Sequence, residues 1–186
     1  MIVSKFVKEY IKNILAEKRL EFGNRAVCPF AKPELESNKL MISTIGEKSL
    51  GQLIDEFYLS EHESALFIIK KDIPANQTQK FQIFVNKVLK TKGLKEYKSI
   101  CLNPNDEISV DGYNPRSKAP YFMINIARRD VLIEAQKALQ KTEYYDKLPE
   151  EYRKFLKLPT KSKTIKWASL IKLEPNYNMH LTEQQL

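Results

Sequence analysis

The stretch Ala65-Leu66-Phe67-Ile68-Ile69 decides the fold, because it is the most apolar run in the chain. A run of this length suits a strand, and its lack of polar alternation is typical of a strand covered on both faces. It is far shorter than the roughly 18 apolar residues of a membrane-spanning helix. The run therefore predicts a strand inside a sheet that other elements cover.

Segments with helical and strand patterns alternate outward from this run. Strands are predicted at 40–45, 65–69, 97–102 and 121–127. Apolar residues at three- and four-residue spacing predict amphipathic helices between and around them. The helices are expected from residue 2 to a stop at Gly23-Asn24, over 49–59, from an Asn76 cap to Gly93, and from an Asp130 cap through Leu139.

The order of these elements predicts the sheet topology. Strands separated by helices favour parallel crossovers, whereas the last two strands follow each other without a helix and favour an antiparallel pair. We therefore expect the α/β class, with α+β as the alternative, and a small mixed four-stranded sheet with helices packed on it. The 186 residues fit a single α/β domain over 1–158, with a C-terminal extension over 159–186 that packs on it or is partly flexible.

The composition bounds the classes of function. The first residues lack the apolar segment of a signal peptide, so we expect a cytoplasmic protein with no membrane partner. Two cysteines and two histidines argue against a disulfide framework and against a zinc site, so no metal ligand is predicted and any cofactor stays unknown. The net charge of +8 suits nucleic acid or anionic metabolites as partners, but it also suits a solvated, lysine-rich surface.

Cys28 is the first candidate for chemistry. It lies in the loop 25–33, where Pro29 and Pro33 argue against regular helix and against a central strand. Arg25 and Lys32 are near in sequence, and cations lower the pKa of a thiol and make it a nucleophile. The alternative is that Cys28 is a small buried hydrophobic residue, as free cysteines often are.

The second candidate is an anion site built from arginines. Arg116 lies in a loop between Pro115 and Pro120, and Arg128 and Arg129 end the following strand. Arginine forks suit carboxylate or phosphate. If the chain runs straight between them, Arg116 and Arg128 are too far apart to contact one small anion together. Either the loop folds back along the strand or only one of them is the ligand contact, and we favour Arg116. The alternative for Arg128 and Arg129 is pairing with surface carboxylates such as Asp130 or Glu134.

Both candidate loops carry a resemblance to a known family. Cys28-Pro29-Phe30-Ala31-Lys32, the Asn114-x-Arg116-x-x-x-Pro120 loop and the strand end Ala127-Arg128-Arg129 resemble the uncharacterised bacterial domain-of-unknown-function 1415 family. In that family a CPFA-like motif follows the first helix. A later loop with arginine and proline leads into a strand that ends in an arginine before a helix. The resemblance implies a shared site but no reaction.

One departure from the family concerns a base. The family has a Phe-His-Pro segment after the third strand, whereas this chain reads Cys101-Leu102-Asn103-Pro104. If that histidine is a catalytic base in the family, this chain has lost it or uses another group.

Three classes of function follow. The first is an enzyme or binding pocket for a small anionic metabolite. Cys28 would be its nucleophile or an acid/base group, and Asp106 or Asp111 a second proton-transfer group. Its anion contacts would be Arg25, Arg116, Arg128 and Arg129. It requires Cys28 and Arg116 to converge.

The second is a nucleic-acid-binding module that uses the Lys161-to-Lys166 run beside Trp167. The third is a protein-interaction role without chemistry, whose oligomeric state the sequence leaves open.

Overall fold

The computed structural model describes residues 2–46, 48–107, 109–141 and 144–145. All of them belong to the unit Met1–Leu148. The predicted C-terminal extension and the Lys161-to-Lys166 run lie outside the described residues. No described helix is long and apolar enough to cross a membrane.

The first part of the chain forms short elements around one longer helix. In order they are α1 (Ile2–Tyr10), the π-helix η1 (Ile11–Leu15), β1 (Lys18–Arg19), the 3-10 turn η2 (Leu20–Phe22), β2 (Arg25–Ala26) and α2 (Ala31–Glu36). Strands β1 and β2 pair antiparallel as a small separate ribbon.

The remaining elements build the main sheet and its helices. They are β3 (Leu40–Thr44), α3 (Leu50–Tyr58), β4 (Ser64–Ile69), η3 (Ala75–Gln77), α4 (Thr78–Thr91), β5 (Tyr97–Leu102), η4 (Arg116–Lys118), β6 (Phe122–Arg128) and α5 (Arg129–Gln140). The four predicted strands are all present, and Tyr97–Leu102 has the predicted bounds.

The sheet has the strand order β3-β4-β6-β5. Strands β3 and β4 are parallel neighbours, and β6 is antiparallel to both β4 and β5. It follows that β5 runs in the direction of β4 but is separated from it by β6. The predicted mixed four-stranded sheet is confirmed, including the antiparallel pair of the last two strands.

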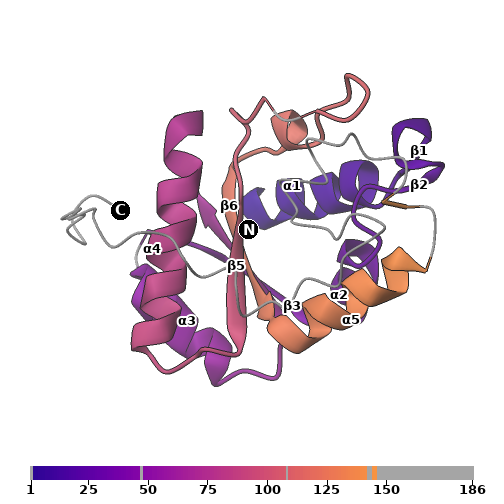
Figure 1. The fold of residues 1–186 in the computed structure, drawn as a ribbon. Coiled ribbons are helices and arrows are strands. Elements are labelled where there is room, and N and C mark those ends of the chain that lie inside the picture. Colours follow the sequence, from indigo (N-terminus) through magenta and orange to yellow (C-terminus); the bar gives the residue numbers. More distant parts are fainter. Residues whose placement is uncertain (1, 47, 108, 142–143, 146–186) are drawn as a thin grey trace, which may run out of the picture. The chain divides into compact units, whose positions relative to one another are not determined.

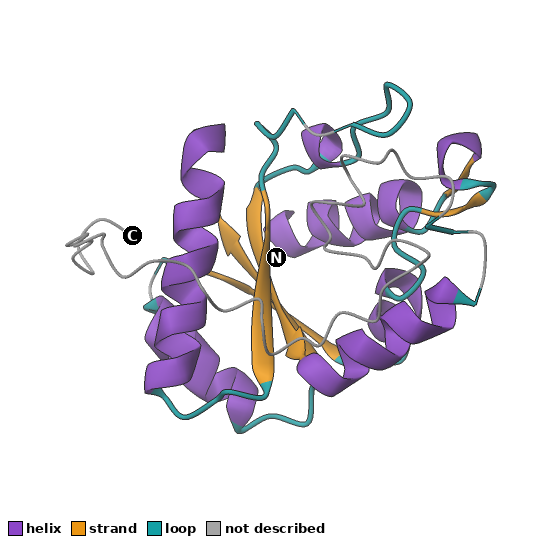
Figure 2. Ribbon diagram, in the orientation of Figure 1, coloured by secondary structure: helices purple, strands orange, loops and turns teal. Residues whose placement is uncertain are grey.

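Helices cover both faces of this sheet. Figures 1 and 2 show α3 and α4 on one side, and α1, α2 and α5 on the other. On the first side the ring centroids of Phe81 and Phe122 are 5.4 Å apart. On the second side Val7 and Ile11 pack in a buried cluster with Leu66 of β4. Successive residues of β4 therefore point to opposite faces and pack into two separate hydrophobic cores, one on each side of the sheet. This is what the unbroken apolar sequence of the strand predicts.

The first predicted helix ends earlier than expected. The stop at Gly23-Asn24 is wrong, because the helical segment ends at Leu15 after widening into a π-helix in which the Ala16 N–H donates to the Ile11 carbonyl at 2.9 Å. Gly23 instead caps the 3-10 turn with a φ of 65°. The apolar pattern itself stops at Leu15, which is the signal that marks this boundary.

Three further local predictions need correction. The segment 25–33, predicted as a loop without helix, contains the start of α2. Pro33 fits in the first turn of this helix because the backbone N–H groups there have no partner within the helix. Asn76 lies within η3, and α4 begins after Gln77 without a side-chain cap. Asp130 lies inside the first turn of α5, whose capping residue is Arg128.

Phe67 of β4 provides a test of this double-sided core. Its side chain is fully buried, so Phe67→Ala should lower the free energy of unfolding by about 3–5 kcal/mol. Ile83→Ala is the matched control, because Ile83 lies on α4 with 55% exposure and should change stability by less than about 0.5 kcal/mol. Chemical denaturation measures both, and equal losses would contradict the assigned core.

Candidate functional site

The pairing register places the predicted site residues at opposite ends of the strands β4 and β6. Ser64 pairs with Ala127 at one end of β4, and Ile69 pairs with Phe122 at the other. Five residue steps of roughly 3.3 Å separate these ends by about 17 Å. Arg128 therefore lies near the first residue of β4, whereas the Arg116 loop enters β6 near the last residue of β4.

Arg116 is held by a carboxylate of its own chain. Its Nη1 donates to Oδ2 of Asp106, and the two side chains are only 11% and 14% exposed. Asn114 orders the same loop, because its Oδ1 accepts the N–H groups of Arg116 at 2.9 Å and Ser117 at 3.2 Å. A ligand carboxylate at Arg116 would have to compete with Asp106, so the contact we favoured from the sequence is here a structural ion pair.

Asp111 lies in a tight hairpin turn. Val110 and Tyr113 exchange two backbone hydrogen bonds of 2.9 Å across Asp111-Gly112. Asp111 and Gly112 have φ values of 47° and 79°, which is the pattern of a type I′ turn with its preferred Asp-Gly sequence. Turn geometry accounts for Asp111, and its predicted role in proton transfer stays a prediction.

Arg128, Arg129 and Arg25 are exposed. The Arg128 guanidinium pairs with both carboxylate oxygens of Asp130, at 3.2 and 2.5 Å, as the alternative interpretation expected. Arg129 donates from Nε to the Tyr97 carbonyl at 3.1 Å. Arg25 lies on β2 with an exposed side chain.

Asn103 lies in the segment where the family that the sequence resembles has histidine, and here it is a structural residue. It is fully buried, and its Nδ2 donates to the Ile73 carbonyl at 2.9 Å and to Thr78 Oγ1 at 2.8 Å. Its Oδ1 accepts the Asn105 N–H at 2.9 Å. These bonds tie the ends of β4 and β5 to the start of α4, and the amide supplies no base.

The π-helix positions Cys28. Its last residue, Leu15, turns its carbonyl to accept the Cys28 N–H at 2.8 Å, and the Cys28 carbonyl accepts the Ala31 N–H at 3.3 Å. The chain thus folds from η1 through the Cys28 loop into α2. The residue keeps partial exposure, but its thiol is withdrawn from water.

The environment of the Cys28 thiol differs from the one expected. Burial raises the pKa of the thiol, and the Glu34 carboxylate raises it further, while the N–H groups of Phe30 and Ala31 lower it. Arg25 and Lys32 are not among the groups that shift it, so the expected cation-stabilised thiolate is wrong. The resting form of Cys28 is the protonated thiol.

Glu34 is the group near Cys28 that the sequence analysis missed. It lies on α2, and its Oε2 accepts a 2.7 Å hydrogen bond from the hydroxyl of Ser64, a fully buried residue at the start of β4. Burial raises the pKa of Glu34, and the Ser64 hydrogen bond opposes this. Glu34 thus acts electrostatically on Cys28 and is hydrogen-bonded to Ser64, and we call these three residues the thiol cluster.

The thiol cluster and Arg116 do not converge. The cluster is tied to the first residue of β4, and the Arg116 loop leads to the partner of its last residue. The shared pocket that the enzyme hypothesis required from Cys28 and Arg116 is therefore replaced by two separate polar sites. One sequence signal for the missed residues is Ser64 itself, a polar residue directly before the apolar run 65–69.

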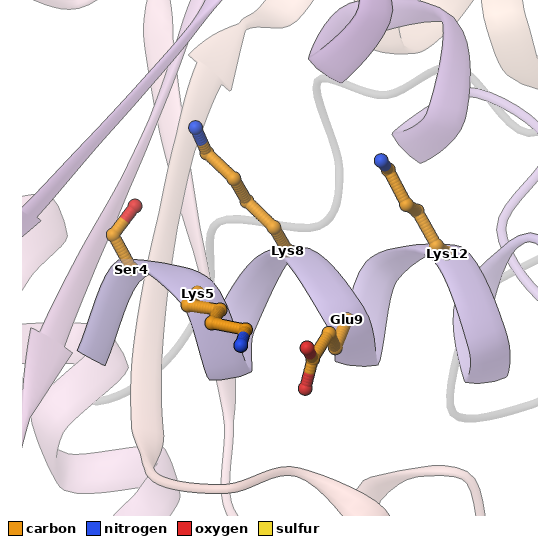
Figure 3. Close-up of a pocket in the computed structure, with 5 residues that line it drawn as sticks. All are labelled: Ser4, Lys5, Lys8, Glu9 and Lys12. Carbon is orange, nitrogen blue, oxygen red and sulfur yellow. The ribbon is translucent and has the colours of Figure 1, made fainter. Parts of the chain in front are cut away.

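A hollow lies over the solvent side of α1. It has a volume of about 390 Å³ and is lined by Ser4, Lys5, Lys8, Glu9 and Lys12. Figure 3 shows the side chains of Lys8 and Lys12 extending to the same side of the helix. Among the described residues no group of three or more His, Cys, Asp or Glu side chains is placed to hold a metal ion.

The arginine assignments lead to a stability prediction. Arg116→Ala should lower the free energy of unfolding by about 3 kcal/mol, because it leaves the Asp106 carboxylate nearly buried without its partner. Arg128→Ala, the control, should leave stability unchanged because both members of its pair are about half exposed. Denaturant titration at neutral pH compares them. A larger loss in Arg128→Ala would refute the structural role of Arg116.

Comparison with protein-family models, curated proteins and solved structures finds no match to this chain. The likeness of the Cys28 and Arg116 loops to the bacterial family described above thus stays a prediction from the residues themselves.

Proposed function

We propose that this chain is a thiol-dependent enzyme that acts in the cytoplasm on a small anionic metabolite, with Cys28 as the nucleophile. The thiol cluster is the observation that carries the proposal. It combines a desolvated thiol, a carboxylate with a raised pKa and a buried hydroxyl that orients the carboxylate. A nucleophile, a base and a group that orients the base are the parts that covalent catalysis requires.

The chemistry follows from the two raised pKa values. A protonated thiol is a poor nucleophile, so Cys28 needs a base at the moment of attack. Glu34 suits this role because a carboxylate with a raised pKa accepts a proton more readily. The Cys28 sulfur would bond to an electrophilic carbon while its proton passes to Glu34. As the bond to the leaving group breaks, Glu34 would return that proton to the leaving group.

We assign anion binding to Lys39 and Arg128, which lie at the same end of β4 as the thiol cluster. Lys39 lowers the pKa of Glu34 and pairs with Glu63 at 2.5 Å, and Arg128 lies one residue beyond the partner of Ser64. Both side chains are about half exposed, so they can exchange a surface carboxylate for a ligand anion at little cost. This arrangement favours Arg128 over Arg116 as the ligand contact.

Acetyl phosphate, a small anionic acyl donor, tests the nucleophile. Intact-mass measurement should show one acetyl group on Cys28, none on Cys28→Ser, and at least a tenfold slower reaction in Glu34→Gln, within the ~10²–10⁴-fold range of general-base catalysis. Cys101→Ala is the matched control and should react as the parent does, because Cys101 is buried. Acetylation that persists in Cys28→Ser, or is as fast in Glu34→Gln, would overturn the proposal.

The pH dependence of iodoacetamide alkylation tests the electrostatics. Because burial and Glu34 raise the pKa of Cys28, the midpoint should lie above the ~8.5 of a free thiol. Glu34→Gln removes a negative charge and should move the midpoint to lower pH. Cys101, with a pKa of about 12, should stay unmodified across this range. A Cys28 that resists alkylation while Cys101 reacts would identify Cys28 as an inert buried residue.

A further inference from the structure

The two outer strands of the sheet, β3 and β5, differ in how their outer backbone edges are covered. At β5 the edge is closed by amide side chains of α4, which lies beside this strand (Figure 1). Asn86 Oδ1 accepts the Ser99 N–H at 3.0 Å, and Gln82 Oε1 accepts the Cys101 N–H at 3.2 Å. Ser99 and Cys101 are themselves buried, so no further strand can pair with β5 here.

The outer edge of β3 carries backbone groups without such partners. The Ile45 N–H donates to the Ile68 carbonyl at 2.8 Å, and the bonds of a parallel ladder involve alternate residues, so the odd-numbered residues of β3 bond to β4. The even-numbered residues, Leu40, Ile42 and Thr44, turn their N–H and C=O groups outward. Within the part of the chain that the structure describes, no side chain or neighbouring strand pairs with these groups.

The sequence of β3 lacks the features that usually keep a free edge from pairing. Leu40–Thr44 reads LMIST, without a charged residue or a proline, and its pairing with β4 is regular from end to end. All five residues are partly exposed, whereas every residue of β4 is buried. A free, regular and mainly apolar edge of this kind is a template for one more strand.

A second copy of the same strand fits this edge. In an antiparallel pair with a two-fold axis at Ile42, that residue lies opposite itself and Leu40 lies opposite Thr44. Every outward N–H of one copy then meets an outward C=O of the other, because directly opposite residues of an antiparallel pair exchange both bonds. Opposite residues also share a face of the sheet. The apolar layer that Leu40 and Ile42 form with α1 would thus continue into the partner.

The charges at the two ends of β3 are compatible with this arrangement. Lys39 pairs with Glu63 at the start of the strand, and Lys48 pairs with Glu56 just beyond its end, both at 2.5 Å. Antiparallel pairing brings the start of one strand to the end of the other, so a neutral pair meets a neutral pair. Two chains of net charge +8 therefore approach where these charges are balanced, and the half-exposed side chains can exchange partners across the contact.

We propose that the chain forms a closed dimer by antiparallel pairing of β3 with β3 of a second copy. Because the amides of α4 close the edge of β5, assembly stops at two copies and does not continue as a filament. The pairing uses backbone groups that have no part in the proposed catalysis, so either proposal can fail without the other.

Sedimentation of the full chain over a range of concentrations tests the proposal. The parent should approach twice the mass of one chain. Thr44→Pro removes an outward N–H and leaves the bonds to β4 intact, since an edge strand tolerates proline at such a position. It should raise the dissociation constant of the dimer at least tenfold, because the two-fold axis repeats the loss. Thr44→Ala is the matched control, because it truncates the side chain but keeps the N–H, and it should dimerise as the parent does.

Amide hydrogen exchange measured by NMR identifies what occupies the edge. The N–H groups of Leu40 and Ile42 should become protected in the parent as its concentration rises, and should stay unprotected in Thr44→Pro. A monomeric parent that exchanges them freely would overturn the proposal and leave the edge to an extended segment of another protein.

Three other outcomes would also overturn the proposal. Protection of these groups in a monomeric parent would show that another part of the chain closes the edge. Equal dimerisation of the parent and Thr44→Pro would place the interface elsewhere, and assembly beyond a dimer would show that the edge of β5 is not closed. Circular dichroism confirms that each variant is folded.

Discussion

Burial of β4 on both faces is the constraint on which the rest of the domain depends. Every residue from Ser64 to Ile69 is buried. A strand with no solvent face needs a neighbour at each edge and a helical layer on each side, because its backbone groups need partners and its side chains need apolar cover. Strands β3 and β6 supply the edges. Helix α1 covers one face, and α3 and α4 cover the other (Figure 1).

The insertion of β6 beside β4 decides where polar chemistry can lie. Because β6 is antiparallel, its first residues meet the end of β4 and its last residues meet the start. The Arg116 loop and the thiol cluster are consequently at opposite ends of β4. At one end the ion pair of Arg116 with Asp106 is nearly buried and fixes a loop. At the other end the thiol cluster is tied to Ser64, and the side chains of Lys39 and Arg128 are about half exposed there.

The features that could be predicted from the sequence are those that depend on neighbouring residues in the chain. The four strands and the mixed sheet follow from apolar runs and from the order of elements. The helix starts at Asn76 and Asp130 were wrong because a polar residue near a helix start signals a cap only when the backbone leaves the helix there. The contact between Glu34 and Ser64 joins residues 30 positions apart, so no local pattern contains it. The pKa of Cys28 was misjudged for the same reason, since burial in three dimensions outweighs cations that are near only in sequence.

Burial acts on both ionisable groups of the thiol cluster. Withdrawal from water raises the pKa values of Cys28 and Glu34 together, because the charged form of each is penalised. If Cys28 ionises with Glu34 charged, two anions share a dry site. If its proton passes to Glu34, one negative charge replaces another and the net charge of the cluster is unchanged. In the mechanism that we propose, proton transfer within the pair avoids two negative charges in one buried site, and the N–H groups of Phe30 and Ala31 stabilise the charge on sulfur.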